Sequence, residues 1–183
     1  MKLESFRAEN PVRWKIAVID GPNMTNLGNR SQKIYGPIRS IDDLQKLVRD
    51  VAEALHVDVT QFVSNYEGEI LEFIHGAAAT HHGFIINPAG LTTYGEATRH
   101  ALEDTTKPVI ECHFSNTARH FATTVPPYLN QQSRFTYTAT GLVMGMRQYS
   151  YVGALLGLVM SLDDETFLAG RQVNVDAPVD LRF

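Results

Sequence analysis

The sequence contains a single cysteine, Cys112, so no disulfide can form within the chain. This is compatible with a reducing compartment. No apolar run approaches the roughly 20 residues that a helix needs to cross a bilayer. The first residues also lack the apolar segment of a secretory signal peptide. We therefore expect a cytoplasmic protein without a membrane segment, in which Cys112 is a buried structural residue.

An excess of basic charge is missing as well. The 183 residues include 16 Lys and Arg against 20 Asp and Glu, which gives a net charge of -4. This balance provides no electrostatic attraction for nucleic acid or for an anionic membrane. It still leaves room for a local cationic site that binds a small anion. We therefore expect neither nucleic acid nor a membrane as a partner.

Short apolar runs alternate with amphipathic runs, without internal repeats or low-complexity linkers. The apolar runs predict strands at 16–19, 57–63, 84–86, 108–112 and within 135–144. The amphipathic runs predict helices at 41–55, 67–80, 93–102 and 149–162, the first with Ser40 as its N-cap. This alternation is typical of βαβ units around a parallel sheet. We expect an α/β fold, a flavodoxin-like doubly wound sandwich with a five-stranded parallel sheet in the order 2-1-3-4-5.

The chain divides into three parts. We predict an N-terminal arm over 1–13, a domain over 14–162 and a C-terminal tail over 163–183. Apolar residues alternate in the tail, so it could add an edge strand to a neighbouring subunit; they are Val173, Val175, Val179, Leu181 and Phe183. A loosely ordered tail fits the sequence equally well.

A long polar loop follows the first predicted strand. It runs from Gly21 to Gly36, begins Gly21-Pro22-Asn23, and carries Arg30 and Tyr35. Ligands usually bind at the carboxyl ends of the strands in an open α/β sheet. The loop is therefore a candidate site, and the alternative is an ordinary surface loop whose Arg and Tyr serve solubility and packing.

Four further segments follow the loop. They are Gln61–Glu69, Ile85–Thr92, Ile110–Asn116 and the Gly-rich stretch Thr140–Leu156, and they include Ser64-Asn65-Tyr66-Glu67-Gly68-Glu69 and Ile110-Glu111-Cys112-His113. Taken in order with the loop, they resemble type II dehydroquinase (3-dehydroquinate dehydratase) over residues 14–162, as a divergent member of that family. The resemblance implies a carbon–oxygen lyase that removes water from its substrate by trans elimination through an enolate. It implies no cofactor and no metal ion, and a place in the shikimate pathway or in quinate catabolism.

The resemblance also implies roles for individual residues. Tyr35 matches the catalytic base, and Arg30 matches the arginine that stabilises its phenolate form. His113 matches the general acid that protonates the departing hydroxyl. Glu111 lies two residues earlier on the same strand face, where a carboxylate can hold the imidazole. Asn23 matches the residue that holds a water against the enolate oxygen.

A second set of residues would bind the substrate. Asn87 matches a substrate-binding asparagine, and the backbone N–H groups of Phe114 and Ser115 are placed to receive a carboxylate. Arg119 matches an arginine of the family, and Thr93 stands where the family usually has a substrate-binding histidine. The loops after the first, third and fourth strands should converge at one edge of the sheet, so both sets would reach one ligand.

Three positions depart from the family pattern. Besides Thr93, His100 stands in the place of an aspartate that reaches a neighbouring subunit's site, and Thr123 lies near the place of a second arginine. In the family, the residues at these three positions bind the ring hydroxyls of the substrate. The residues that match the family's proton-transfer groups are unchanged in this chain. We therefore expect a small carboxylate as substrate, either 3-dehydroquinate or a related carboxylated cyclic hydroxy ketone with a changed hydroxyl pattern.

Two alternatives share the scaffold. One is an enzyme of different reaction type, an isomerase or hydrolase of a cyclic dicarbonyl compound; the other is a non-catalytic binding protein, against which the intact proton-transfer set argues. The remaining histidines show no metal-ligand context and are expected at the surface or in helix packing; they are His56, His75, His81, His82 and His120. The resemblance further implies a symmetric homo-oligomer built from trimers, such as a dodecamer.

Overall fold

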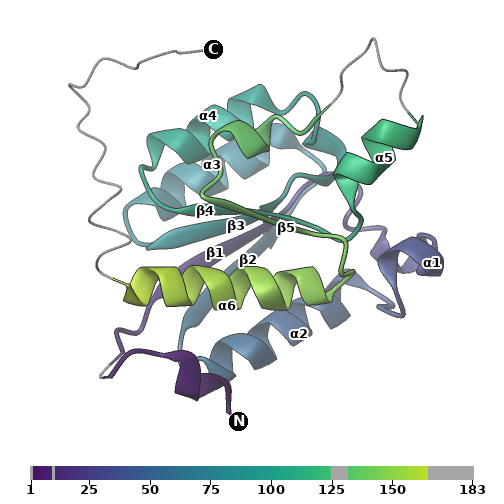
Figure 1. Ribbon diagram of the computed structural model, residues 1–183. Coiled ribbons are helices and arrows are strands. Elements are labelled where there is room, and N and C mark those ends of the chain that lie inside the picture. The colour runs from purple at the N-terminus through teal and green to yellow at the C-terminus, as the bar shows by residue number, and fades with distance from the viewer. Residues whose placement is uncertain (1, 10, 125–131, 165–183) are drawn as a thin grey trace.

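Five parallel strands form one sheet in the computed structural model, which describes residues 2–9, 11–124 and 132–164. The strands are β1 (Lys15–Asp20), β2 (Asp58–Val63), β3 (Gly83–Asn87), β4 (Val109–His113) and β5 (Gly141–Met144). Their order across the sheet is β2-β1-β3-β4-β5, and every neighbouring pair is parallel. The predicted α/β fold and strand order are confirmed, and all five carboxyl ends lie at one edge of the sheet (Figure 1).

Helices cover both faces of the sheet. One face carries α2 (Ile41–Ala54) and α6 (Tyr149–Asp163), and the other carries α3 (Glu67–Ala78) and α4 (Glu96–Asp104) (Figure 1). Two short helices, α1 (Gln32–Tyr35) and α5 (Thr117–Thr124), follow the carboxyl ends of β1 and β4. Single 3-10 turns complete the described elements, at Leu3–Phe6, Leu27–Asn29, Ala89–Leu91 and Phe135–Tyr137. No helix of the described segments is both long and apolar enough to cross a membrane.

The predicted elements are present, with differences at some ends. Ser40 caps α2 as predicted, because its Oγ accepts a hydrogen bond from the backbone N–H of Asp43 at 3.0 Å. Helix α4 begins at Glu96 and not at Thr93, because the chain first turns back on itself: the carbonyl of Leu91 accepts the N–H groups of both Tyr94 and Gly95. Helices α1 and α5 were not predicted.

Alternation along the strands divides the core into two layers. Ile16 and Val18 pack against α2 and α6, whereas Ala17 and Ile19 pack against α3 and α4. Cys112 is fully buried in the first of these layers, as predicted, and burial raises the pKa of its thiol. Its neighbours along β4 therefore point to the opposite face of the sheet.

One buried guanidinium fastens the N-terminal arm to the domain. The Nε of Arg7 donates to Asp163 at 2.5 Å, and its other nitrogens donate to the carbonyls of Leu55 and Val12. The indole N–H of Trp14 donates to the same carboxylate at 2.7 Å. The side chains of Arg7 and Asp163 are only 2% and 7% exposed. Asp163, with which the predicted tail begins, is thus the last residue of α6, and the alternating positions of that tail lie outside the described residues.

A buried polar network lies at the carboxyl end of β1. The hydroxyl of Tyr151 in α6 donates to Asp20, and Nδ2 of Asn87 donates to that hydroxyl oxygen at 2.8 Å. Burial raises the pKa of Asp20 to about 7, although the hydrogen bonds from Tyr151 and Asn87 act in the opposite direction. Burial also raises the pKa of Tyr151 well above its usual range. The network ties the ends of β1 and β3 to α6.

Replacing Arg7 by alanine should lower the free energy of unfolding by about 3 kcal/mol, because it leaves the Asp163 carboxylate buried without its cation. Chemical denaturation at neutral pH measures the change. Arg13→Ala is the matched control, since Arg13 forms its ion pair with Asp58 at the surface and should contribute much less. Equally small effects of both substitutions would show that the arm contributes nothing to the folded domain.

Asp20→Asn should make the protein more stable at alkaline pH and reduce the dependence of stability on pH. The folded-state pKa of about 7 lies above the usual 3.8, so the folded chain binds more protons than the unfolded chain between these values. The free energy of unfolding of the parent should therefore fall as pH rises through this window, by roughly 4 kcal/mol on complete ionisation. Asparagine still accepts from Tyr151 but does not ionise.

Urea unfolding of the parent and of Asp20→Asn at about pH 5 and pH 8 tests this expectation. The difference between the two proteins should be much larger at the higher pH. An equal difference at both pH values would contradict a titrating carboxyl at this position.

Candidate active site

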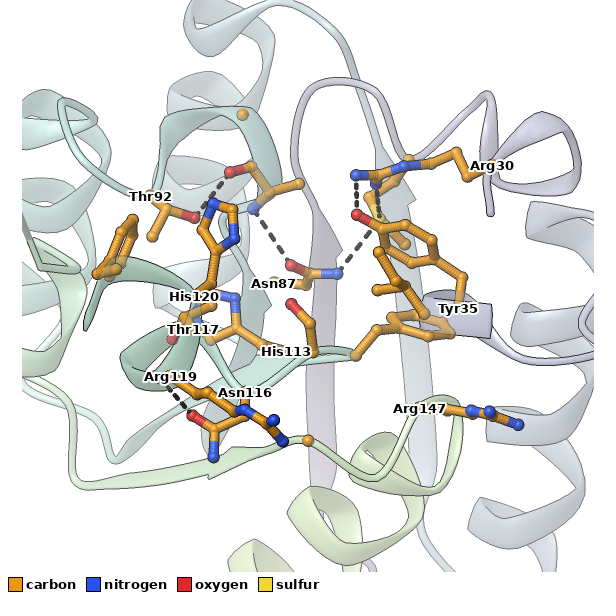
Figure 2. Close-up of a pocket in the computed structure, with 18 of the residues that line it drawn as sticks. Arg30, Tyr35, Asn87, Thr92, His113, Asn116, Thr117, Arg119, His120 and Arg147 are labelled. Atoms are coloured by element: carbon orange, nitrogen blue, oxygen red, sulfur yellow. Dashed lines mark hydrogen bonds between the residues drawn. The ribbon is translucent and has the colours of Figure 1, made fainter. Parts of the chain in front are cut away.

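A cavity of about 820 Å³ opens at the carboxyl edge of the sheet, where the loops after β1, β3, β4 and β5 meet (Figure 2). Its volume is typical of sites that bind small organic ligands. Its described lining includes most of the predicted site residues: Arg30, Tyr35, Asn87, Thr93, His113, Phe114, Ser115 and Arg119.

The predicted pair of Arg30 and Tyr35 is present on one wall of the cavity. Arg30 Nη2 donates to the Tyr35 hydroxyl oxygen, and Arg30 Cζ lies 3.8 Å from the centroid of the tyrosine ring. The ring also packs against Phe114, with 5.8 Å between ring centroids. A permanently charged guanidinium thus lies against both the hydroxyl and the ring face of Tyr35.

His113 and Glu111 form the second predicted pair. Nε2 of His113 lies 2.6 Å from Oε1 of Glu111, and the two side chains are 5% and 0% exposed. Burial alone would raise the pKa of Glu111, but hydrogen bonds from His113, Ser133 and Thr136 bring that pKa below its usual value. An ionised carboxylate only accepts, so Nε2 carries a proton. Nδ1 is then the ring nitrogen that can serve a ligand.

The two predicted asparagines lie differently. Asn87 lines the cavity, but the backbone N–H of Ala89 donates to its Oδ1 at 3.1 Å, and its Nδ2 contacts Tyr151 and Met24. Its amide is thus held inside the protein, and contact with a ligand would have to replace the Met24 contact. Asn23 is exposed and does not line the described cavity. Its role stays a prediction.

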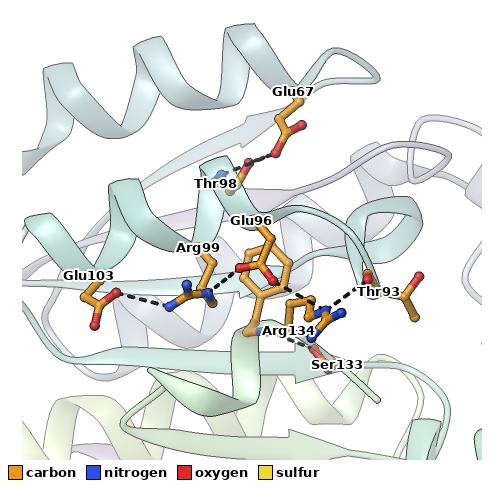
Figure 3. A network of polar contacts seen from close by, with 9 residues as sticks. Glu67, Thr93, Glu96, Thr98, Arg99, Glu103, Ser133 and Arg134 are labelled. Carbon is orange, nitrogen blue, oxygen red and sulfur yellow. Dashed lines mark hydrogen bonds and ion pairs between the residues drawn. The ribbon is translucent and has the colours of Figure 1, made fainter. Parts of the chain in front are cut away.

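A network of ion pairs lies behind Thr93 (Figure 3). Arg134 Nε donates to the Thr93 carbonyl at 3.3 Å and lies 3.4 Å from Glu96. Arg99 joins Glu96 to Glu103 at 2.8 and 3.1 Å. These contacts fix the backbone of Thr93 while its side chain remains at the cavity. Glu96, Arg99 and Glu103 of α4 are thereby paired with one another or with Arg134. None of these four side chains is among the described residues that line the cavity.

Two of the three positions that depart from the family pattern line the cavity, and the third does not. Thr93 and Thr123 line the cavity, whereas His100 is exposed on α4 and lies outside the described lining. Helix α5, which supplies Thr123, also brings His120 to the cavity. His120 was predicted at the surface or in helix packing. The eight residues of α5 are of mixed character and show no clear helical pattern.

Arg147 is another lining residue that the sequence analysis missed. In the sequence, Arg147 is a basic residue just after the fifth predicted strand, within the Gly-rich stretch, and this position could have indicated a site residue. With it, the described lining holds four basic side chains, those of Arg30, Lys33, Arg119 and Arg147, and no carboxylate. In a chain of net charge -4, this local surplus favours an anionic ligand.

The described part of the chain contains no cluster of three or more His, Cys, Asp or Glu side chains that could hold a metal ion. Tyr35 and His113, each with its partner, lie next to a basic surface, and both residue types are able to transfer protons.

Comparison with known proteins identifies the family of the chain. A family model described as Dehydroquinase class II matches residues 14–159. The chain is 37% identical over 145 residues to a 3-dehydroquinate dehydratase of Halothermothrix orenii, across 79% of this chain and 93% of that protein. A type II dehydroquinase structure from Propionibacterium acnes has a TM-score of 0.71 and 30% identity, covering 82% of this chain and 99% of that one. One from Butyrivibrio crossotus has a TM-score of 0.70 and 29% identity, covering 80% and 97%.

The matched segment holds the whole sheet, the Arg30–Tyr35 and Glu111–His113 pairs and every described residue that lines the cavity. It also accounts for most of the chain and, in the relatives named above, for nearly their full length. The chain therefore belongs to the class II dehydroquinase family.

Proposed function

We propose that the protein is a hydro-lyase that removes water from 3-dehydroquinate, the substrate named for its relatives. The observation that carries this proposal is the convergence of two pairs on one cavity: Arg30 with Tyr35, and Glu111 with His113. An elimination needs a base for the proton and an acid for the departing hydroxyl. The two pairs supply one of each.

The basic lining would receive the carboxylate of the substrate. Arg119 contributes a charge, and the chain at Phe114 and Ser115 offers backbone N–H groups at the end of β4. Binding there would hold the ring between the two pairs. Thr93 would then lie near the ring hydroxyls, where it offers a hydroxyl group as a hydrogen-bond partner.

The reaction would begin with Tyr35 as a phenolate beside Arg30. The phenolate takes a proton from the carbon next to the ketone, and the electrons of that C–H bond form an enolate. Collapse of the enolate expels the hydroxyl, which takes a proton from Nδ1 of His113 in its imidazolium form and leaves as water. Proton exchange with solvent then restores Tyr35 and His113. The role predicted for Asn23, a water held against the enolate oxygen, requires its exposed side chain to turn toward the cavity.

A related carboxylated cyclic hydroxy ketone is the second candidate substrate for the same reaction. Thr93 and Thr123 favour it, because both line the cavity and neither offers the charged contact expected from the family pattern. The ratio of kcat/KM for the two kinds of substrate decides between them. We further propose a homo-oligomer based on trimers, located in the cytoplasm.

Tyr35→Phe should lower kcat for 3-dehydroquinate by about 10³-fold or more, because the ring remains and only the proton acceptor is lost. Ultraviolet absorbance of the conjugated enone product measures turnover. Tyr94→Phe is the matched control, since Tyr94 is 64% exposed and does not line the described cavity. Near-normal turnover by Tyr35→Phe, with the fold intact by circular dichroism, would remove Tyr35 as the base.

Arg30→Ala should lower kcat for 3-dehydroquinate by about 10²-fold or more, with a smaller change in KM, because the Tyr35 hydroxyl loses the cation that lies beside it. Steady-state kinetics of the parent and the variant measure both constants. A raised KM with unchanged kcat would assign Arg30 to substrate binding instead.

A further inference from the structure

Helix α1 carries Tyr35 at its last position and has only four residues, and at its end the backbone N–H of Gly36 donates to the Gln32 carbonyl at 2.9 Å. The carbonyl of Lys33 would ordinarily accept from the N–H four residues later. That residue is Pro37, which has no N–H. The helix therefore offers no donor to this carbonyl near Tyr35, which is left to accept from another segment or from water.

Arg147 supplies that donor. Its Nη2 donates to the Lys33 carbonyl oxygen at 3.1 Å, across 114 positions of sequence. Arg147 belongs to the loop between β5 and α6, and its own backbone N–H donates to the Phe114 carbonyl at 2.9 Å. It therefore joins α1 to the end of β4. Figure 2 shows Arg147 on the same side of the cavity as Tyr35.

The backbone has a positive φ angle on both sides of this contact, at Arg147 and at Gly36. Arg147 has a φ of 56°, a left-handed conformation that costs energy for a residue with a side chain. Gly36, directly after Tyr35, has a φ of 80°. A Cβ at Gly36 would lie 2.9 Å from Cδ of Arg147 and 2.7 Å from the side-chain oxygen of Gln148. The glycine thus makes room for the arginine stem against α1.

We propose that Arg147 is a positioning residue, which holds α1 so that the Tyr35 hydroxyl stays beside Arg30 and faces the substrate. This inference rests on the proposed role of Tyr35 as the base. Arg147 acts through the Lys33 carbonyl and the packing against Gly36. Its loss should therefore lower the rate of proton abstraction more than it weakens substrate binding, because small displacements of a reacting group slow the reaction strongly.

The test uses Arg147→Met, which keeps an apolar stem against Gly36 and removes the donor. For this variant we expect kcat for 3-dehydroquinate to fall roughly 10- to 100-fold, with KM changed by less than about threefold. Arg147→Lys should recover part of kcat, because an ammonium group can donate to one carbonyl. Arg13→Ala controls for the loss of an exposed arginine away from the cavity.

A second measurement does not depend on activity. Trypsin should cleave after Lys33 faster in Arg147→Met than in the parent, because α1 opens more often without its cap. Mass spectrometry identifies the cleavage site. Arg147→Gln, whose shorter side chain does not reach Lys33, replaces the Met variant if that protein does not fold.

The outcomes separate the inference from the proposed function. A raised KM with unchanged kcat would overturn the inference and place Arg147 in contact with the substrate. Unchanged kcat together with unchanged cleavage would also overturn it. If the parent does not dehydrate 3-dehydroquinate, the proposed function fails, and the cleavage rates still decide whether Arg147 holds α1.

Discussion

All five strands run in the same direction, and the position of every residue in the candidate site depends on that constraint. Parallel strands need a crossover connection, which returns the chain to the edge from which the previous strand started. The loops that leave the strands therefore meet at the opposite edge. Arg30 and Tyr35 arrive from β1, Asn87 from β3, and His113 from β4, although long stretches of sequence separate them.

Tyr35 and His113 reach the cavity on supports of different kinds. His113 ends a buried strand, and Glu111 lies on the same face two positions earlier, so strand geometry alone brings the pair together. Tyr35 lies on a helix of four residues, which is far too short to be stable by itself. Its place must come from contacts with other segments, namely the ring of Phe114 and the tether from Arg147. The loop that carries Tyr35 therefore depends on contacts with segments that are distant in the sequence.

Sequence patterns predicted those parts of the structure that local physics determines. Apolar runs located the strands, and the two-residue period of a strand placed Glu111 beside His113. Several features that the sequence did not predict depend on contacts between distant segments. No local pattern shows that the amide of Asn87 is occupied by Tyr151, or that Arg147 reaches Lys33. The start of α4 was misplaced for a different, local reason, because the carbonyl of Leu91 accepts the N–H groups of Tyr94 and Gly95 in a turn that the apolar spacing does not reveal.

The basic character of the cavity also depends on the positions of nearby carboxylates, which are buried or paired with basic residues away from the cavity surface. Glu111 lies behind His113 and accepts from Thr136, while Asp20 lies beneath Tyr151, so neither carboxylate faces the cavity. Burying them opposes ionisation, which is why the pKa of Asp20 rises to about 7. Glu96 is paired with basic partners behind the cavity wall. An anionic ligand would meet the basic side chains without repulsion from these groups, because each carboxylate is neutralised or turned inward before the ligand arrives.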